Sequence, residues 1–269
     1  MNKENKTMQP VIQVQHLTKR YKGAAKNSVD DISFTVNEGE FFAFLGANGA
    51  GKTTTISILT TTLGKTSGEV TIAGCDLNKD EKDVRTHIGI ISQKPSLDLD
   101  LSAEENIRLH VCMYGMYAYK PFFKWMPKSY RDQVLAMAEL MGIGGSLWKP
   151  LKAHSGGMQR KIEIIRSLMH RPAVLFLDEP SQGLDAVSRR DLWAYIDSMR
   201  KEYGTTVFLT THYIDEAENV DRLALINHGK IIFSGTPAEL KGERRQKSLE
   251  DAYINILSNA SSCVEGAAT

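Results

Sequence analysis

The 269-residue sequence lacks any apolar run approaching the roughly 18 to 20 uninterrupted residues that a bilayer-spanning helix needs. Its longest compact apolar runs, at residues 41–45 and 174–177, have the length of strands. The first residues include basic side chains, but no apolar stretch follows them as it would in a secretory signal. We therefore expect a chain that does not cross a membrane and stays in the cytosol.

The sequence also lacks an excess of either charge sign and has few cysteines. The 33 Lys and Arg residues face 32 Asp and Glu residues, which gives a formal net charge of +1. Without a basic excess to neutralise phosphates, nucleic-acid binding is not expected. The 3 cysteines lack CxxC spacing, so neither a disulfide framework nor a zinc site is indicated. Apolar residues at 42% and charged residues at 24% are typical of a globular chain of one large domain or two small ones.

Strand and helix patterns alternate along most of the chain. The expected strands cover residues 32–36, 41–45, 70–72, 88–91, 174–177, 206–210, 223–226 and 230–233. Helices are expected at residues 53–63 and in the segment that carries Leu192, Ile196 and Met199. Residues 95–170 have a helical texture broken by Gly and Pro, which indicates an inserted helical lobe. The sequence therefore predicts an α/β core with a mostly parallel sheet.

A glycine-rich segment follows the apolar run at residues 41–45 and precedes a helical pattern. It fits G-x-x-x-x-G-K-[ST] with Gly46, Ala47, Asn48, Gly49, Ala50, Gly51, Lys52 and Thr53. Glycines allow successive N–H groups to turn inward and form an anion site at a helix N-terminus. Lys52 adds a charge near the β- and γ-phosphates, and the Thr53 hydroxyl can bind Mg²⁺. The alternative, a fortuitous glycine-rich turn, is disfavoured by the strand-to-helix setting.

Two adjacent acids, Asp178 and Glu179, end the apolar run at residues 174–177. Parallel α/β sheets place their ligands at the carboxyl ends of the strands. Asp178 is therefore a candidate Mg²⁺ ligand and Glu179 a candidate general base for an attacking water. A solvated acidic turn would be the simpler interpretation of this segment taken alone.

A second helix begins with a short polar segment, Ser155, Gly156, Gly157 and Met158. Its start offers another N-terminal anion site, although a flexible helix cap explains the same residues equally well. The combination of this segment with the glycine-rich segment at residues 46–53 and the acidic pair indicates a function more specifically than any one of the three does.

Together these motifs resemble the ATP-binding subunit of an ATP-binding cassette (ABC) transporter, in the order of that family, over about residues 11–240. The resemblance places the P-loop on residues 46–54, including Thr54, and the switch glutamine on Gln93. The signature falls on residues 155–158, the D-loop aspartate on Asp185, the switch histidine on His212, and the adenine-stacking aromatic on Tyr21.

The resemblance implies two such subunits closed head to tail around two ATP molecules. Ser155 and Gly157 of one chain would contact the γ-phosphate held by Lys52 of the other. Glu179 would polarise the lytic water, and His212 would hold the γ-phosphate. Thr53, Gln93 and Asp178 would bind Mg²⁺, while Asp185 would couple the two sites. An isolated chain would therefore have an incomplete active site.

The resemblance also implies a P-loop NTPase core with an N-terminal antiparallel β-subdomain and an inserted α-helical subdomain. We expect one ABC ATPase domain over residues 1–240, its core and β-subdomain at 10–93 and 171–240 and its helical subdomain at 94–170. Residues 241–269 would form a C-terminal helix and a disordered tail. Membrane-spanning permease subunits would be separate chains, with this subunit peripheral on the cytoplasmic face of the cell membrane.

Some positions depart from the family pattern. Ala47 stands where the family often has proline. His154 stands in place of the usual signature leucine, and Met158 stands in place of the usual glutamine. The Ser-Gly-Gly-Met sequence and the tail at residues 249–253 resemble the branch that exports drugs, antibiotics or polysaccharides, so we favour export. A soluble ABC ATPase without a transport role and the ATPase of an importer are the alternatives.

An aromatic cluster at residues 114–125, YGMYAYKPFFKW, lies in the helical lobe. By the resemblance it would face the membrane partner, either as a docking surface or against lipid headgroups. A core segment with a variable loop is an equal alternative.

Overall fold

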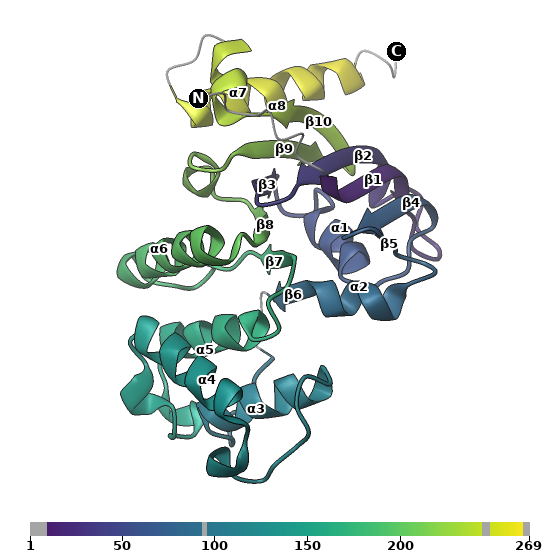
Figure 1. The fold of residues 1–269 in the computed structure, drawn as a ribbon. Helices are drawn as coiled ribbons and strands as arrows, with labels where there is room; N and C mark the ends of the chain where they lie inside the picture. The colour runs from purple at the N-terminus through teal and green to yellow at the C-terminus, as the bar shows by residue number, and fades with distance from the viewer. Residues whose placement is uncertain (1–9, 93–95, 244–247, 266–269) are drawn as a thin grey trace, which may run out of the picture. The chain divides into compact units, whose positions relative to one another are not determined.

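The computed structural model describes residues 10–92, 96–243 and 248–265. The backbone divides into two compact units, which are described separately (Figure 1). Unit 1 comprises Met1–Arg85 and Thr206–Thr269, and unit 2 comprises Thr86–Thr205.

Unit 1 contains an antiparallel sheet with the strand order β2-β1-β4-β5. The strands are β1 (Pro10–Lys19), β2 (Val29–Asn37), β4 (Ser67–Ile72) and β5 (Cys75–Asp76). In β2, Ile32, Phe34 and Val36 are buried and alternate with exposed residues, as the period of two predicts. This sheet confirms the predicted N-terminal antiparallel part.

Parallel strands form the second half of unit 1. Strand β3 (Phe41–Leu45) pairs in parallel with β8 (Thr206–Thr211) and β9 (Arg222–Asn227), and β10 (Lys230–Gly235) runs antiparallel to β9. All five residues of β3 are buried. Phe34 lies 5.8 Å from Phe42 and 6.0 Å from Phe208, between ring centroids. Such aromatic pairs add about 0.5 to 1.5 kcal/mol each beyond area burial, so they hold the two sheets together.

Helix α1 (Lys52–Leu59) is shorter than the predicted helix at residues 53–63. The chain leaves the helix in a threonine-rich turn, where Thr61 has a φ of 60° and the Thr62 and Leu63 N–H groups both donate to the Ser57 carbonyl. Branching at Cβ restricts χ1, so a run of threonines favours an early end to the helix.

Two helices close the described part of unit 1, α7 (Pro237–Glu243) and α8 (Leu249–Glu265). Thr236 and Glu239 cap α7 reciprocally, at 2.7 and 3.1 Å. On α8, Leu249, Ala252 and Ile256 are buried on one face. The helix ends at Glu265, and residues 266–269 lie outside the described residues.

Unit 2 combines a parallel strand pair with four helices. Strand β6 (Ile88–Ile91) pairs with β7 (Val174–Asp178), and the helices are α3 (Ala103–Met113), α4 (Lys128–Leu140), α5 (Gly156–Leu168) and α6 (Ala186–Tyr203). Short 3₁₀ turns occupy Phe123–Trp125, Gly144–Ser146 and Leu151–Ala153. Helix α2 (Glu81–His87) leads from unit 1 into unit 2.

The predicted helical insertion and α/β pattern are both present. Backbone packing groups β7 and α6 with the helices of unit 2, whereas the sequence-based division assigns them to the core. The subdomain boundaries therefore stay predictions. Within the described ranges, no helix has the length and apolarity that spanning a bilayer demands.

Candidate functional site

The glycine-rich loop between β3 and α1 is shaped by close backbone contacts. Gly49 and Gly51 have φ values of 79° and 113°, which L side chains rarely adopt. A Cβ on Gly46 would lie 2.4 Å from the Ile226 carbonyl oxygen, and one on Gly51 would lie 2.6 Å from that of Ser28. The glycines at both positions are therefore required for the loop to close against its neighbours.

Lys52 starts α1 and folds back over the loop. Its side chain is only 4% exposed, and its Nζ donates to the carbonyl oxygens of Gly46 at 2.7 Å and Ala47 at 3.1 Å. No described side chain caps the N-terminus of α1. Backbone N–H groups at the start of α1 are therefore available to a ligand, and the Lys52 ammonium lies beside them over the loop. This arrangement suits phosphate.

His212 follows β8 at the same sheet edge. Leu45 pairs with Thr211 in parallel register, and the Gly46 N–H donates to the Thr211 carbonyl at 3.3 Å. The Thr211 hydroxyl bonds to Glu216, which is 8% exposed. This bond braces the segment that carries His212, so unit 1 brings the P-loop and the predicted switch histidine to one edge.

Tyr21 follows β1 of the antiparallel sheet and reaches the first turn of α1. Its hydroxyl lies 3.4 Å from Thr54 Oγ1, and Lys19 Nζ lies 5.4 Å from the ring centroid. The side chain is 43% exposed, so a ring face is open to a stacked base. Unit 1 therefore brings together Tyr21, residues 46–54 and His212.

Asp178 and Glu179 end β7 in unit 2, where they are 9% and 8% exposed. Glu179 has a φ of 46°, a left-handed conformation that is uncommon for a residue with a side chain. Strain of this kind concentrates at functional sites. The backbone thus marks Glu179 independently of its acidic side chain, and the sequence held no signal of this strain.

Ser155 caps α5 with its own side chain, which accepts a hydrogen bond from the Met158 N–H at 3.3 Å. Ser155 and Gly156 are exposed, while Gly157 and Met158 are half-buried. Asp185 is exposed before α6, and its carboxylate accepts the Val187 N–H at 3.0 Å. Both segments present polar groups at the surface of unit 2.

His154 has a different environment from the residues that follow it. It is 6% exposed, and its Nδ1 and Nε2 lie 3.0 Å from the carbonyl oxygens of Pro150 and Ser146. The histidine therefore fixes the loop before α5 by polar contacts, where a leucine would do so by apolar packing.

A buried ion pair on α5 was missed by the sequence analysis. Arg160 bonds to Glu163 at 2.6 Å, to the Pro180 carbonyl at 3.1 Å and to the Ser92 carbonyl at 2.6 Å. Burial raises the pKa of Glu163 and lowers that of Arg160. Arg160 thus ties the signature helix to the residues beside Glu179 and Gln93. The sequence feature that could have indicated this pair is the spacing of Arg160 and Glu163, three residues apart on an otherwise apolar helix face.

The predicted switch glutamine, Gln93, lies outside the described residues. Of the other predicted site residues, Tyr21, residues 46–54 and His212 lie in unit 1. The rest lie in unit 2, and these are Ser155, Gly156, Gly157, Met158, Asp178, Glu179 and Asp185.

The sequence profile of the family described as ABC transporter matches residues 29–182, more than half of the chain. The chain belongs to the ABC transporter family. Domains of this family bind and hydrolyse ATP. The match spans residues 46–54, 155–158 and 178–179, and the predicted resemblance of the chain to this family is confirmed.

Named relatives of this ABC chain are bacterial. It is 36% identical to the probable multidrug ABC transporter ATP-binding protein YbhF of Escherichia coli, over 92% of this chain and 42% of that protein. It is 36% identical to the daunorubicin/doxorubicin resistance ATP-binding protein DrrA of Streptomyces peucetius, over 86% of this chain and 66% of that protein. The bacitracin transport ATP-binding protein BcrA of Bacillus licheniformis is 34% identical over 90% of this chain and 75% of that protein. The chain thus spans less than half of the E. coli relative.

Solved structures agree on the ABC fold. One described as the ATP-binding subunit of an ABC transporter has a TM-score of 0.80 at 25% identity, over 92% of this chain and 99% of that one. CbiO1 of Clostridium perfringens, part of the CbiONQ transporter complex, has a TM-score of 0.76 at 26% identity, over 87% and 92% of the two chains. The predicted P-loop NTPase fold class is confirmed.

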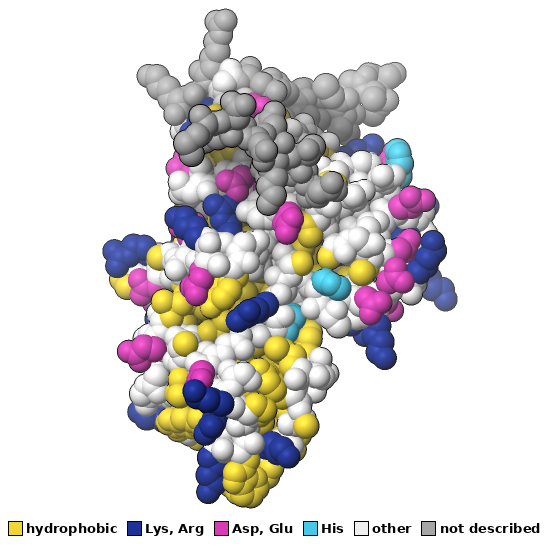
Figure 2. Space-filling view, in the orientation of Figure 1, with side chains coloured by type: hydrophobic (Ala, Val, Ile, Leu, Met, Phe, Trp, Pro, Cys, Tyr) yellow, Lys and Arg dark blue, Asp and Glu magenta, His cyan; other side chains and the backbone are white. Residues whose placement is uncertain are grey.

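The aromatic cluster at residues 114–125 is partly exposed in this ABC chain. Tyr119, Phe122 and Trp125 are each more than half exposed, and Lys124 Nζ lies about 6 Å from the Phe122 and Trp125 rings. Figure 2 shows hydrophobic side chains gathered over the helical part of unit 2 with Lys and Arg among them. Tyr114, Tyr117 and Phe123 are half-buried, so the docking surface and the core segment with a variable loop both stay predictions.

Proposed function

We propose that this chain is an ATP-hydrolysing subunit that dimerises around two ATP molecules and powers export through separate membrane-spanning subunits. The observation that carries the proposal is the cradle at the start of α1, where Lys52 is buried against the Gly46 and Ala47 carbonyls. Next to it, Asn48, Gly49 and Thr53 are exposed to an incoming phosphate.

The residues present fit Mg²⁺. Thr53 offers an exposed hydroxyl and Asp178 a carboxylate, and both are the oxygen ligands that Mg²⁺ prefers. Among the described residues, no three His, Cys, Asp or Glu side chains cluster as a metal cage. This donor set suits an ion held by few protein ligands together with nucleotide phosphates. When bound, Mg²⁺ would offset the negative charge of the phosphates.

The proposed reaction assigns each residue one task. Glu179 accepts a proton from water as the water oxygen bonds to the γ-phosphorus, and the bond from that phosphorus to the ADP oxygen breaks. Lys52 and the loop N–H groups stabilise the charge on the transferred group. His212 orients the γ-phosphate, and Gln93 would couple this site to the helical part of unit 2.

A second copy, or a homologous ATPase subunit, would complete each site. Ser155 and Gly157 lie at the surface of unit 2 in the single chain. Their helix start would meet the γ-phosphate bound to the partner's P-loop, and Asp185 would pass the state of one site to the other.

Export is supported by the relatives, which carry the names multidrug, daunorubicin/doxorubicin resistance and bacitracin transport. We infer permease partners in the membrane and a peripheral position on its cytoplasmic face. An importer would add a substrate-binding protein to the complex, and a non-transport ATPase would have no permease.

Affinity purification of the tagged full chain from native membranes in mild detergent tests this proposal. We expect a polytopic membrane protein in stoichiometric amount, with ATP turnover retained in the complex. Recovery with a substrate-binding protein would indicate an importer. Recovery from the soluble fraction alone, with no membrane protein, would contradict the transport function.

A further inference from the structure

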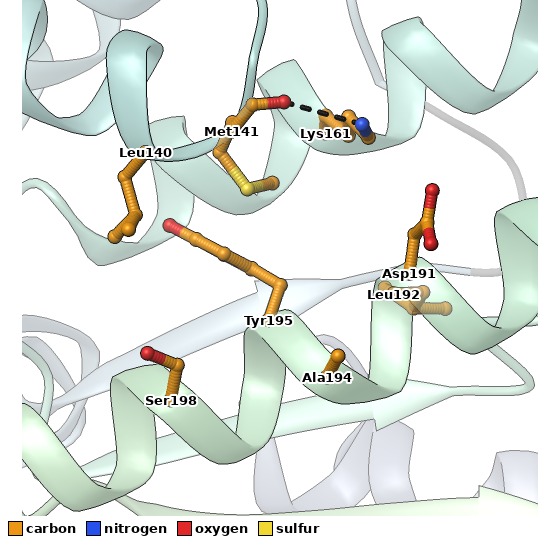
Figure 3. A pocket seen from close by; sticks show the side chains of 8 residues that line it. All are labelled: Leu140, Met141, Lys161, Asp191, Leu192, Ala194, Tyr195 and Ser198. Atoms are coloured by element: carbon orange, nitrogen blue, oxygen red, sulfur yellow. Dashed lines mark hydrogen bonds between the residues drawn. The ribbon is translucent and has the colours of Figure 1, made fainter.

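A cavity lies within unit 2, and its lining includes none of the residues that the proposed function uses. It has a volume of about 310 Å³, opens to the surface and is lined by the end of α4, the first turns of α5 and one face of α6. Figure 3 shows its lining side chains, which are Leu140, Met141, Lys161, Asp191, Leu192, Ala194, Tyr195 and Ser198. Its size is at the lower end of the range for small-molecule sites.

The hydroxyl of Tyr195 is unpaired in this cavity. Tyr195 is 8% exposed, and its oxygen has no hydrogen-bond partner in the described part of the chain. Burial also raises the pKa of the phenol, so the group stays neutral. Figure 3 shows the hydroxyl pointing toward Leu140 and Met141. An unsatisfied buried hydroxyl costs about 1 to 3 kcal/mol, so its persistence calls for a partner that the chain does not supply.

The charges of the lining balance each other. Lys161 Nζ donates to the Met141 carbonyl at 3.2 Å, and the carboxylate of Asp191 lies on the same side of the view as Lys161 in Figure 3. One cation and one anion leave no net charge to attract an ionic ligand. Leu140, Met141 and Leu192, with the ring of Tyr195, provide the apolar surface.

We propose that this cavity binds a small, uncharged, largely aromatic molecule that carries one hydrogen-bonding group. The apolar walls hold the body of the ligand, and the polar group pairs with the Tyr195 hydroxyl. The ligand reaches that hydroxyl by displacing Leu140, a residue that is 53% exposed.

The cavity shares a wall with the signature segment. Lys161, Asp191 and Leu192 also line a hollow of about 180 Å³ formed with Ser155, Gly157 and Leu184. A ligand between α5 and α6 therefore acts on the spacing of the two helix starts that carry Ser155 and Asp185. On this basis, which rests on the proposed function, the ligand changes the rate of ATP turnover.

Titration of the full chain with N-phenyl-1-naphthylamine, excited directly, tests the binding. This probe is uncharged and aromatic, has one N–H group and fluoresces on leaving water. We expect one saturable component. Tyr195→Phe should weaken it about 3- to 10-fold, as expected for one neutral hydrogen bond, without lowering the melting temperature. Ala194→Trp, at an exposed position of α6, should fill the cavity and abolish that component.

Two control variants separate this site from other apolar surface. Glu202→Trp adds the same ring to α6 outside the cavity, and Phe122→Ser with Trp125→Ser removes the exposed aromatic cluster. Both should leave the saturable component unchanged. Loss of that component in either control, its survival in Ala194→Trp, or an unaltered affinity in Tyr195→Phe would overturn the proposal.

The ATPase readout is kept separate from the binding readout. The probe should alter ATP turnover in the wild-type chain and leave it unaltered in Ala194→Trp. Binding without any change in turnover would overturn the coupling alone. A chain without ATPase activity would contradict the proposed function, while the fluorescence titration would still decide whether the cavity binds the probe.

Discussion

Helix α1 follows a glycine-rich loop and α5 begins with two glycines, yet the N-termini of the two helices are capped differently. In α1 the preceding residue is Gly51 in a left-handed conformation, no described side chain caps the helix, and Lys52 is buried over the loop. In α5 the exposed Ser155 accepts the Met158 N–H and closes the helix start itself. The backbone N–H groups at the start of α1 are left available to a ligand. At the start of α5, the side chain of Ser155 accepts one of these N–H groups.

The difference indicates how the work is divided between the two units. Unit 1 holds the phosphate cradle at the start of α1, whereas unit 2 carries the acidic pair and the start of α5, which its own Ser155 caps. We therefore expect changes in unit 1 to affect nucleotide affinity and changes in unit 2 to affect turnover.

Glu179→Gln in unit 2 should produce the largest effect. Removing a general base lowers the rate by about 10² to 10⁴, so ATP turnover should fall by that factor. Binding of ATP should stay within twofold of wild type, measured by equilibrium titration, and ATP-bound dimers should accumulate on size-exclusion chromatography. The exposed Glu218→Gln is the matched control, and turnover near the wild-type rate in Glu179→Gln would remove the residue from this role.

Lys52→Ala in unit 1 should affect binding. A lost hydrogen bond from a charged group is worth about 1.5 to 3 kcal/mol, which weakens nucleotide affinity roughly 10- to 150-fold. Titration calorimetry with ATP measures this change, and Lys65→Ala is a control in the same unit. Unchanged affinity in Lys52→Ala would contradict the reading of α1 as a ligand-ready helix start.

Acid should destabilise unit 2 through His110. Burial, with contributions from Arg166 and His170, lowers its pKa to about 3, and the Tyr114 ring lies tilted against it at 4.5 Å between ring centroids. Below pH 6.5, His110 binds a proton in the unfolded chain but stays neutral in the folded chain. The free energy of unfolding therefore falls as the pH drops toward 3. One such proton corresponds to about 1.4 kcal/mol per pH unit.

Urea unfolding of the wild type and His110→Phe between pH 7 and pH 5 measures this effect. The phenylalanine keeps an aromatic ring beside Tyr114 but cannot titrate, so its stability should fall less steeply with acid. Equal slopes in the two proteins would show that His110 does not carry this pH dependence.

Ser155→Ala should have the smallest effect and sharpen the comparison of the two helix starts. Losing the cap costs about 1 kcal/mol of stability. Ser102→Ala removes the equivalent cap of α3, where Ser102 accepts the Glu105 N–H at 3.2 Å. Both variants should lose similar stability in thermal melts, but only Ser155→Ala should reduce ATP turnover. An equal loss of turnover in both would show that the effect is one of folding.

Much of the fold could be predicted from local patterns. The alternation in β2 and the unbroken apolar runs of β3 and β7 predicted their burial correctly, because side-chain period and burial are linked directly. The end of α1 could not be placed, because the turn at Thr61 depends on a backbone conformation that threonine rarely adopts.

The site was predictable where spacing alone carries the chemistry. The P-loop and the acidic pair have fixed local patterns, so Lys52 and Glu179 could be named from the sequence. The contacts of Arg160 with the Ser92 and Pro180 carbonyls join segments far apart in the chain, and no local pattern encodes them. The unpaired hydroxyl of Tyr195 likewise exists only once three helices meet.

Mixing two inactive chains tests most directly whether each ATP site is shared between two copies. Lys52→Ala and Ser155→Arg should each be inactive alone. A mixed dimer would have one site with both defects and one site with none, so activity should return to about a quarter of wild type, because random pairing makes half of the dimers mixed. A mixture that stays as inactive as its components would contradict the head-to-tail site.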